Sequence, residues 1–459
     1  MNKRLLISSA LIVALSGCAA THEKTAAADI KFSTAPATNT QRWWLAFNDP
    51  LMDSLADELV AQNIDIKIAT TRVTEARAIA QQTRARLFPE LALSGSTTRS
   101  NTNPGTTGPA TISRGGFDAA WEVDLFGGLR ADTDAATARA IAAGENVNDI
   151  RNSVVADLMR AIIEWRQATQ TLQTTNALLA AQDHQIHLFS VRAEAGLIDT
   201  SFVTRARAER EQTATQIPLA TAAAFAAQYQ IERLLGKPSN ALADELRNVR
   251  EQQVSIPESK TVLDTSIDAM RARPDIRAAE ADLNGARADL ASARANLWPK
   301  LNLSGFFGVQ DVAGGLLVAD NPLWSIGAGI SAPLFNFGRL HAAVDAADSR
   351  SQRAVSTYEN TVLAALQETH TALADYLNGL NSLTQQTAAL HYRQETVALA
   401  DERFRLGLTD MTDLTTAQTE LNRAAILLIE RNSATAIAYI RLQKALATSV
   451  MGDDAVASE

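Results

Sequence analysis

Two stretches of this chain are almost alike. Residues 85–95 are ARLFPELALSG, and residues 295–305 are ANLWPKLNLSG. Between them lies a spacing of about 210 residues, and Asp65-Ile66-Lys67 recurs as Asp275-Ile276-Arg277 at the same spacing. Similarity at a fixed spacing is typical of an internal duplication. The sequence therefore predicts two copies of one structural unit.

Each stretch marks a change from helix to strand. Residues 63–87 and 275–297 are rich in Ala, Arg, Glu and Gln, and Pro89 or Pro299 follows. Because proline cannot continue a helix, we expect a helix to end at each proline. Beyond it, apolar and polar side chains alternate, which predicts one β-hairpin at 90–126 and another at 300–335. The hairpin loops are expected at 101–113 and 311–321, which are rich in Gly, Thr, Asn and Pro.

The second strand of the first hairpin has one apolar face and one polar face. Its apolar face begins at Phe117 and includes Trp121. The polar face carries three acids that we expect to line an aqueous lumen: Asp118, Glu122 and Asp124. If three chains share one pore, these side chains form a dense set of carboxylates, which favours the passage of cations.

A long helical hairpin follows each β-hairpin. Residues 129–195 and 340–406 contain no proline and one glycine each. At about 1.5 Å per residue, each stretch spans roughly 100 Å, which is typical of a coiled-coil rod. A Gly-Leu turn then reverses the chain, and a second helix runs back with apolar residues at heptad spacing. The predicted helical hairpins cover 128–236 and 338–448.

The first residues of the chain have the layout of a secretory signal peptide. A basic segment, Met1–Arg4, precedes an apolar run, Leu5–Leu15, and Leu15-Ser16-Gly17-Cys18 follows. Leu-Ser-Gly-Cys is similar to a bacterial lipobox, in which the cysteine is acylated. We therefore predict that residues 1–17 are removed and that Cys18 is a lipid anchor. No later segment has eighteen consecutive apolar residues, so we expect any membrane crossing to use strands.

These elements define the predicted domains. Residues 18–62 are a lipid-anchored N-terminal segment, 63–260 the first repeat and 261–459 the second. Four transmembrane strands per chain are too few to close a barrel, because the smallest single-chain barrels need about eight. Two chains would supply eight strands and three chains twelve. The predicted fold class is mainly α, with a long antiparallel coiled-coil α-barrel and a β-barrel shared between chains.

Composition excludes several function classes. The chain has 42 basic and 51 acidic residues and a net charge of −9, so we expect no nucleic-acid partner. Its one cysteine excludes a disulfide framework. The motifs G-x-x-x-x-G-K-[ST], H-E-x-x-H and G-x-S-x-G are absent, and we predict neither an enzyme nor a cofactor. Asp183, His184 and His187 have a metal-like spacing, but they lack an evident further ligand and are interpreted as one exposed helix face.

Several features together carry a resemblance to a known family. They are the lipobox, Trp43-Trp44, the segment Phe47–Leu51, Arg77 and the paired Gly-Leu turns. In this order they resemble the outer-membrane efflux lipoproteins of the TolC superfamily, in its NodT-like and OprM-like subgroup. The resemblance implies a homotrimer with a twelve-stranded barrel in outer-membrane lipid, a periplasmic α-barrel and an equatorial belt. It also implies a passive exit duct for small molecules that works with a periplasmic adaptor protein and an inner-membrane pump.

The resemblance places the periplasmic entrance at the two helix turns. The residues expected to contact the adaptor are Gly196, Leu197, Gly407 and Leu408. The acids expected to gate the entrance are Asp199, Asp410 and Asp413. From the residues alone, each of these acids by itself is better explained as a cap of the returning helix. Thr416 stands where some relatives carry a further acid.

Two other functions remain open at this point. The same fold serves type I systems that secrete unfolded polypeptides. A structural lipoprotein that spans the periplasm without a pore would also contain a long coiled coil. Conduction by purified trimers in planar bilayers separates both channel functions from the structural one.

Overall fold

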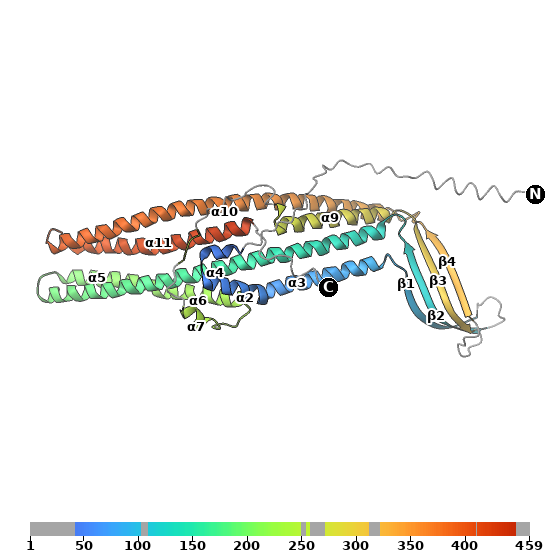
Figure 1. Ribbon diagram of the computed structural model, residues 1–459, viewed down its shortest axis with the longest axis horizontal. Helices are drawn as coiled ribbons and strands as arrows, with labels where there is room; N and C mark the ends of the chain where they lie inside the picture. Colours follow the sequence, from blue (N-terminus) through green and yellow to red (C-terminus); the bar gives the residue numbers. More distant parts are fainter. Residues whose placement is uncertain are drawn as a thin grey trace, which may run out of the picture. The chain divides into compact units, whose positions relative to one another are not determined.

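The structure is a computed structural model, and it describes residues 42–101, 109–248, 254–257, 271–311, 322–409 and 411–446. Two predicted site residues, Cys18 and Asp410, lie outside these ranges, as does the predicted signal peptide. What is described is mainly helical with one small antiparallel sheet (Figure 1).

Short helices begin the described chain. The 3-10 helix η1 (Trp43–Phe47) is followed by α2 (Pro50–Gln62). Asp49 caps α2, because its carboxylate accepts a hydrogen bond of 3.1 Å from the backbone N–H of Leu51. Pro50 suits the first helical position, where its missing N–H leaves no hydrogen bond unmade.

The helix that precedes each hairpin is confirmed. Helix α3 spans Ile64–Ala85 and α9 spans Pro274–Ala295, so in both cases the next strand begins five residues after the end of the helix. The Asn63 side chain caps α3 by accepting from the N–H of Ile66 at 3.0 Å. A proline stands at the start of α9, at the N1 position where it is tolerated best.

Both β-hairpins are confirmed, and their strands form one sheet in the order β1-β2-β3-β4. The strands are β1 (Glu90–Ser100), β2 (Ala110–Val123), β3 (Lys300–Asp311) and β4 (Pro322–Ser331). The sequence-based loop at 101–113 was too long, because β2 already begins at Ala110. The strand also ends at Val123 and not at Leu125, since Asp124 turns to cap the next helix.

The register of the sheet separates its two faces. Four large apolar residues lie opposite one another across the four strands: Leu93, Phe117, Phe307 and Trp324. All four side chains are largely exposed, from 49% for Phe117 to 77% for Leu93. The neighbouring row contains Asp118 opposite Phe306 on the other face. The predicted alternation of an apolar and a polar face is therefore confirmed. Among the described strands, β1 and β4 each have one edge without a partner.

The two long helices are confirmed at 67 residues each. Helix α4 spans Gly128–Glu194 and α10 spans Arg339–Arg405. In the second half, α11 (Met411–Leu446) returns as one helix. Heptad positions Leu414, Ala417 and Leu442 of α11 are buried, as the spacing predicts.

The returning helix of the first half differs from the prediction of one continuous helix. It consists of α5 (Thr200–Ala214) and α6 (Gln216–Leu234), and α7 (Ala243–Asn248) follows. Pro218 explains the break, because it has no N–H to donate to the carbonyl of Ala214. Thr215 between the two helices keeps right-handed helical angles, so the break leaves the direction of the chain largely intact.

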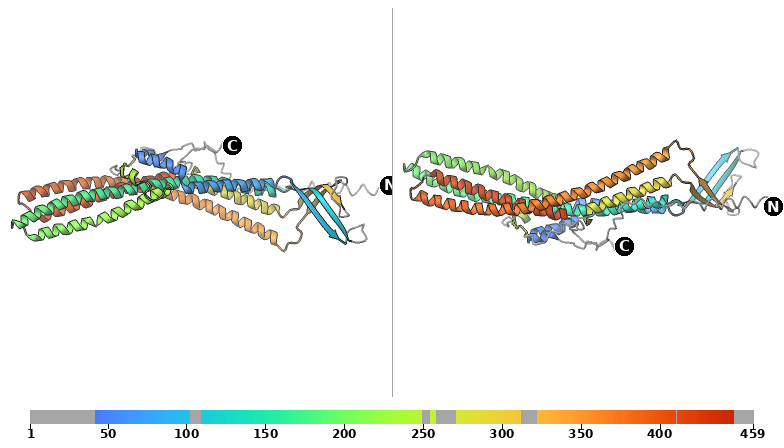
Figure 2. Two further views of the ribbon diagram at one scale, coloured as in Figure 1. Left: turned by 90° about the horizontal axis from the view of Figure 1, so that it is seen from below. Right: turned by 90° about the horizontal axis from the view of Figure 1, so that it is seen from above.

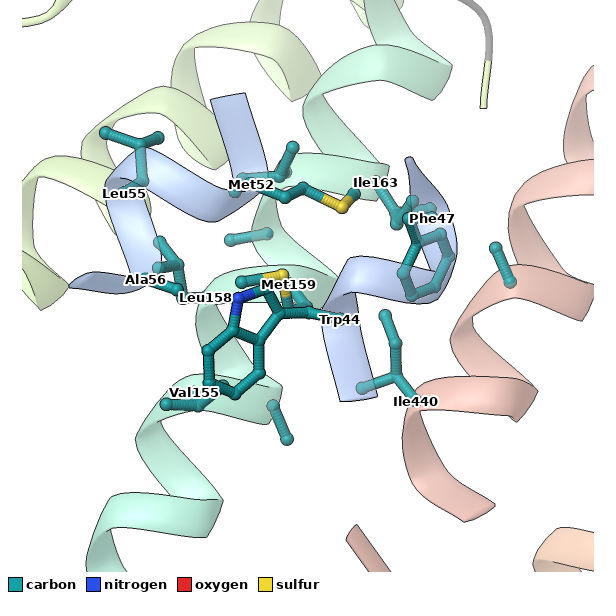
Figure 3. Packing of buried hydrophobic residues seen from close by; sticks show 14 of the residues in the cluster. Trp44, Phe47, Met52, Leu55, Ala56, Val155, Leu158, Met159, Ile163 and Ile440 are labelled. Carbon is teal, nitrogen blue, oxygen red and sulfur yellow. The ribbon is translucent and has the colours of Figure 1, made fainter. Parts of the chain in front are cut away.

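Helix α4 is the centre of the packing. It contacts α2, α3, α5, α6, α9 and α11, whereas α10 packs mainly against α9 and α11 (Figure 2). The largest hydrophobic cluster lies where η1 and α2 meet α4 and α11 (Figure 3). Trp44, Phe47 and Met52 are almost completely buried there against Met159 and Ile440. None of the described helices is both long and apolar enough to cross a membrane.

Candidate functional site

The two Gly-Leu turns have the same hydrogen-bonded geometry. At the end of α4, the N–H of Leu197 donates to the carbonyl of Arg192 at 2.9 Å, and the N–H of Gly196 donates to that of Ala193 at 2.9 Å. This pair of bonds is a Schellman motif, which satisfies the last carbonyl groups of a helix. Gly196 has a φ of 73°, the left-handed conformation that a glycine after a helix C-terminus commonly adopts.

The second turn repeats this arrangement at the end of α10. The N–H of Leu408 donates to the carbonyl of Arg403 at 2.9 Å, and the N–H of Gly407 donates to that of Phe404 at 3.0 Å. Gly407 has a φ of 71°. The side chains of Leu197 and Leu408 are both highly exposed. Each turn therefore presents one exposed leucine on a hydrogen-bonded backbone, and its contact with an adaptor stays a prediction.

Asp199 is a helix cap. Its carboxylate accepts a hydrogen bond of 2.8 Å from the backbone N–H of Ser201 at the start of α5. Hydrogen bonds from the side chain and backbone of Ser201 lower the pKa of Asp199. The carboxylate is therefore charged at neutral pH, where it also interacts favourably with the helix dipole. Its predicted gating role is not tested by this geometry.

Asp413 lies in the first turn of α11 and is exposed. The buried residues Met411 and Leu414 flank it and pack with Phe189 and Val203 in a small cluster near the turns. This cluster joins the two helical hairpins, so their ends are held together by side chains of both. Asp413 is thus exposed beside a hydrophobic cluster that joins the two helical hairpins, where its carboxylate is accessible to ions.

The three acids predicted to line the lumen do not have the same surroundings. Asp118 and Glu122 lie on the polar face of β2, with Asp118 opposite Ala92 and Glu122 opposite Asn302. Asp124 lies beyond the strand. It accepts hydrogen bonds from the N–H groups of Leu129 and Arg130 at 3.2 and 3.0 Å and pairs with the Arg130 guanidinium at 3.0 Å.

Sequence reasoning missed the basic partners of these acids. Lys300 of β3 lies 2.9 Å from Glu122, and Arg114 of β2 lies 3.7 Å from Asp118. Both basic residues belong to the polar face by the register of the strands. Alternation along β2 already placed Arg114 on this face, four residues before Asp118, so that signal was available. The link to Lys300 required the pairing of β2 with β3, which joins the two halves of the chain.

A buried ion pair fixes the N-terminal segment against α4. The Asp49 carboxylate, which caps α2, also pairs with the guanidinium of Arg166, and both side chains are almost fully buried. Removing one partner of such a pair leaves an uncompensated buried charge, which typically costs about 3–5 kcal/mol. The segment Phe47–Leu51, which carried part of the resemblance, is therefore a structural anchor.

A second ionic cluster lies between α4, α9, α10 and α11. Arg273 pairs with Asp275 and Glu368 at 2.8 Å each and donates to the carbonyl of Ala445 in the last turn of α11. Burial raises the pKa of Asp149 nearby, and the Asp275 carboxylate raises it further. Arg273 thus holds the end of the last described helix to the start of α9.

The metal-like spacing near residue 183 has a structural explanation. Asp183 pairs with Arg210 of α5 at 3.0 Å and so links the two helices of the first hairpin. Across the described ranges, no cluster of three or more His, Cys, Asp or Glu side chains is suited to hold a metal ion.

Comparisons with known proteins agree with this architecture. The chain is 28% identical over 389 residues to nodulation protein T of Rhizobium leguminosarum bv. trifolii, which covers 83% of this chain and 82% of that protein. It is 28% identical over 381 residues to the solvent efflux pump outer membrane protein SrpC of Pseudomonas putida, which covers 82% and 80%. The solved structure of the outer-membrane channel OprN superposes with a TM-score of 0.83 at 28% identity and covers 88% of this chain and 92% of that one.

A family model matches most of the chain in two segments. Residues 55–237 and residues 267–448 each match the model described as outer membrane efflux protein. The two segments contain the paired hairpins and the paired Gly-Leu turns described above. This chain belongs to the family of outer membrane efflux proteins.

Proposed function

We propose that this protein is the outer-membrane exit channel of a tripartite efflux system. It passively conducts small molecules from an inner-membrane pump and a periplasmic adaptor to the exterior. Three copies form the channel, with twelve strands in one barrel and the long helices in one periplasmic tunnel. Cys18 carries the lipid anchor, and the two matched segments are the copies of one duplicated unit.

The observation that carries this proposal is the exposed apolar face of a sheet with unpartnered edges. Leu93, Phe307, Trp324 and Ile326 are all mostly exposed on that face. Large exposed apolar patches mark contacts with proteins or lipid. An open strand edge is not tolerated in hydrocarbon, because its backbone groups have no water to bond with. Pairing β1 of one copy with β4 of the next removes both edges, and three copies give a closed barrel.

The helical turns supply the other end of the duct. Two rigid turns with exposed leucines at Leu197 and Leu408 offer small apolar contacts to an adaptor protein. The solvent efflux named for the relative in Pseudomonas putida supports small apolar molecules as cargo. In this proposal the pump selects the cargo, and the duct limits it only by size and charge.

Reconstitution tests the proposal directly. Purified protein is expected to be a trimer by light scattering and to give stepwise ion conductance in planar bilayers. Deletion of the gene should increase the sensitivity of cells to organic solvents or antibiotics, and the wild-type gene should restore resistance. Loss of polypeptide secretion without a change in resistance would instead indicate a type I secretion duct. A rod that does not conduct would contradict both channel functions.

The lipid anchor has a separate test. Cys18→Ala should block acylation, detected by the loss of labelled fatty acid, and slow processing of the precursor. The trimer should remain in the outer membrane, because a single acyl chain contributes only marginal membrane binding. Complete loss of the trimer from that membrane would contradict a barrel held together by strands.

A further inference from the structure

An arginine on the polar sheet face packs against an aromatic ring. The guanidinium carbon of Arg114 lies 3.4 Å from the centre of the Phe306 ring, which is a close cation–π contact. Phe306 is 5% exposed although it belongs to the polar face. This phenylalanine therefore does not project from the face but lies flat beneath Arg114.

Two glycines make room for that ring. Gly116 and Gly308 are directly opposite each other in β2 and β3. A Cβ atom on Gly116 would lie 2.7 Å from the Phe306 ring, and one on Gly308 would lie 2.6 Å from it. Each Cβ atom would lie even closer to a backbone oxygen of the opposite strand, so any larger residue at either position would clash with both the ring and the backbone. The ring thus covers backbone that has no side chains, an arrangement that stabilises glycines in a sheet.

Arg114 is also the outermost charge of the polar face. Within the described strands, this face carries Glu90, Arg114, Asp118, Glu122 and Lys300. Lys300 and Glu122 lie at the helical end and pair with each other at 2.9 Å. Arg114 lies toward the hairpin loops, beyond Asp118. One carboxylate oxygen of Asp118 lies 3.7 Å from the Arg114 guanidinium, and the other accepts a hydrogen bond from the Ser94 hydroxyl. The acids are thus followed by a positive charge along the strand.

We propose that Arg114, seated on Phe306, is the selectivity-determining residue at the outer mouth of the pore. This inference rests on the proposed trimeric channel with the polar face turned inward. Three guanidinium groups around one axis offset the carboxylates behind them and allow anionic solutes to leave. A guanidinium suits solutes with a carboxylate, sulfonate or phosphate group, because its planar fork donates two parallel hydrogen bonds.

Reversal potentials in a potassium chloride gradient test this assignment. Arg114→Gln should raise the ratio of cation to anion permeability about twofold, the effect of one unit charge at about 10 Å in water. The shift should be larger at low salt, where screening is weaker. Arg114→Lys keeps the charge and should leave the ratio near the wild-type value. Phe306→Leu removes the seat of the guanidinium and should shift the ratio in the same direction as Arg114→Gln, by less.

Arg99 supplies a matched control. It is an exposed arginine of β1 on the opposite face of the sheet, opposite Thr111. Arg99→Gln should therefore leave the permeability ratio unchanged. An unchanged ratio in a conducting Arg114→Gln channel, or an equal shift in Arg99→Gln, would overturn the assignment. Absence of conductance in the wild-type protein would instead contradict the proposed channel itself.

Discussion

Helices α4 and α10 have the same length and follow equivalent hairpins, yet they are buried very differently. Along α4, large side chains such as Leu158, Met159 and Ile162 are completely buried. Along α10, the buried positions are few and mostly small. The cause is the number of neighbours, since α4 contacts six helices and α10 mainly two. Helices of equal length thus differ because α10 has fewer helical partners among the described residues.

One exposed side of α10 carries a stripe of large apolar side chains. Leu363, Leu377, Tyr392 and Leu399 are all exposed. At about 100° per residue, these four positions fall within roughly 60° of one another around the helix. Large apolar side chains therefore recur on one surface of α10, interspersed with exposed polar residues such as Asn381 and Glu395, an arrangement that suits packing against another copy.

The largest expected effect comes from placing charge on this stripe. The double variant Leu363→Asp with Leu399→Asp should abolish the trimer, because burial of each leucine contributes about 1.5–3 kcal/mol and the unpaired carboxylates add a further cost. Light scattering of the detergent-solubilised protein measures the change in mass.

Gln394→Asp is the control for this variant. Gln394 is exposed and lies about 140° around α10 from Leu363. This substitution should leave the trimer intact. A trimer that survives the double variant would show that α10 faces water in the assembly.

The returning helices of the two halves also differ. The first half has Pro218 and a break between α5 and α6, and Ile429 of the continuous α11 stands 211 residues later. Ile429→Pro should destabilise the protein by about 3 kcal/mol or more, since it removes a helical hydrogen bond and clashes with the preceding turn. Pro218→Ala should change the free energy of unfolding by less than about 1 kcal/mol, because the surrounding helices already accommodate the break. Thermal unfolding followed by circular dichroism measures both.

Similar losses in the two variants would contradict this asymmetry. The break in the first half would then be a hinge that the fold requires, and not an irregularity that the surrounding helices tolerate. Hydrogen exchange near Thr215 and near Ile429 would then locate the mobile segment.

Local patterns predicted most of the elements, but pairing between distant residues was beyond them. Proline and period-two alternation placed α3 and β1 within a few residues, and glycine placed both turns. Pro218 was visible in the sequence and predicts the break, but the heptad spacing masked it. The buried pair of Asp49 with Arg166 and the contact of Arg114 with Phe306 join residues far apart in the chain. Such contacts depend on packing and register, which no local pattern specifies.

The entrance turns should respond alike, because their geometry is alike. Gly407→Val forces a β-branched residue into the left-handed conformation, which costs about 1–2 kcal/mol. A Cβ atom at this position meets nothing within 4 Å, so backbone strain is the whole effect. Efflux should fall while the trimer persists. Drug accumulation in cells and native gels measure the two outcomes.

Gly407→Asn is the control, because asparagine tolerates the left-handed conformation. It should retain most of the efflux. Equal loss in both variants would indicate that the smooth surface of the turn matters and not its backbone conformation. Gly196→Val should reproduce the effect of Gly407→Val if both turns contact the adaptor.

The smallest expected effect separates capping from gating at the same turns. Hydrogen bonds from Ser201 lower the pKa of Asp199 in the folded protein. A carboxyl group whose pKa is lower in the folded than in the unfolded protein stabilises the fold at pH values above the unfolded-state pKa. This contribution is lost as the pH falls through the folded-state pKa. Asp199→Ala should therefore loosen the start of α5 at pH 7, seen as faster hydrogen exchange, and differ little from wild type in strong acid.

Asp413 stands in the first turn of α11 and is exposed. If three Asp413 carboxylates hold the entrance closed, Asp413→Ala should raise single-channel conductance, whereas Asp199→Ala should not. A ring of acids binds cations, so added divalent cations should reduce wild-type conductance more than that of the Asp413→Ala channel. Unchanged conductance in both variants would leave these acids with a structural role only. A rise in both would extend the gate to the first turn, and the two halves would then act as one ring at the entrance.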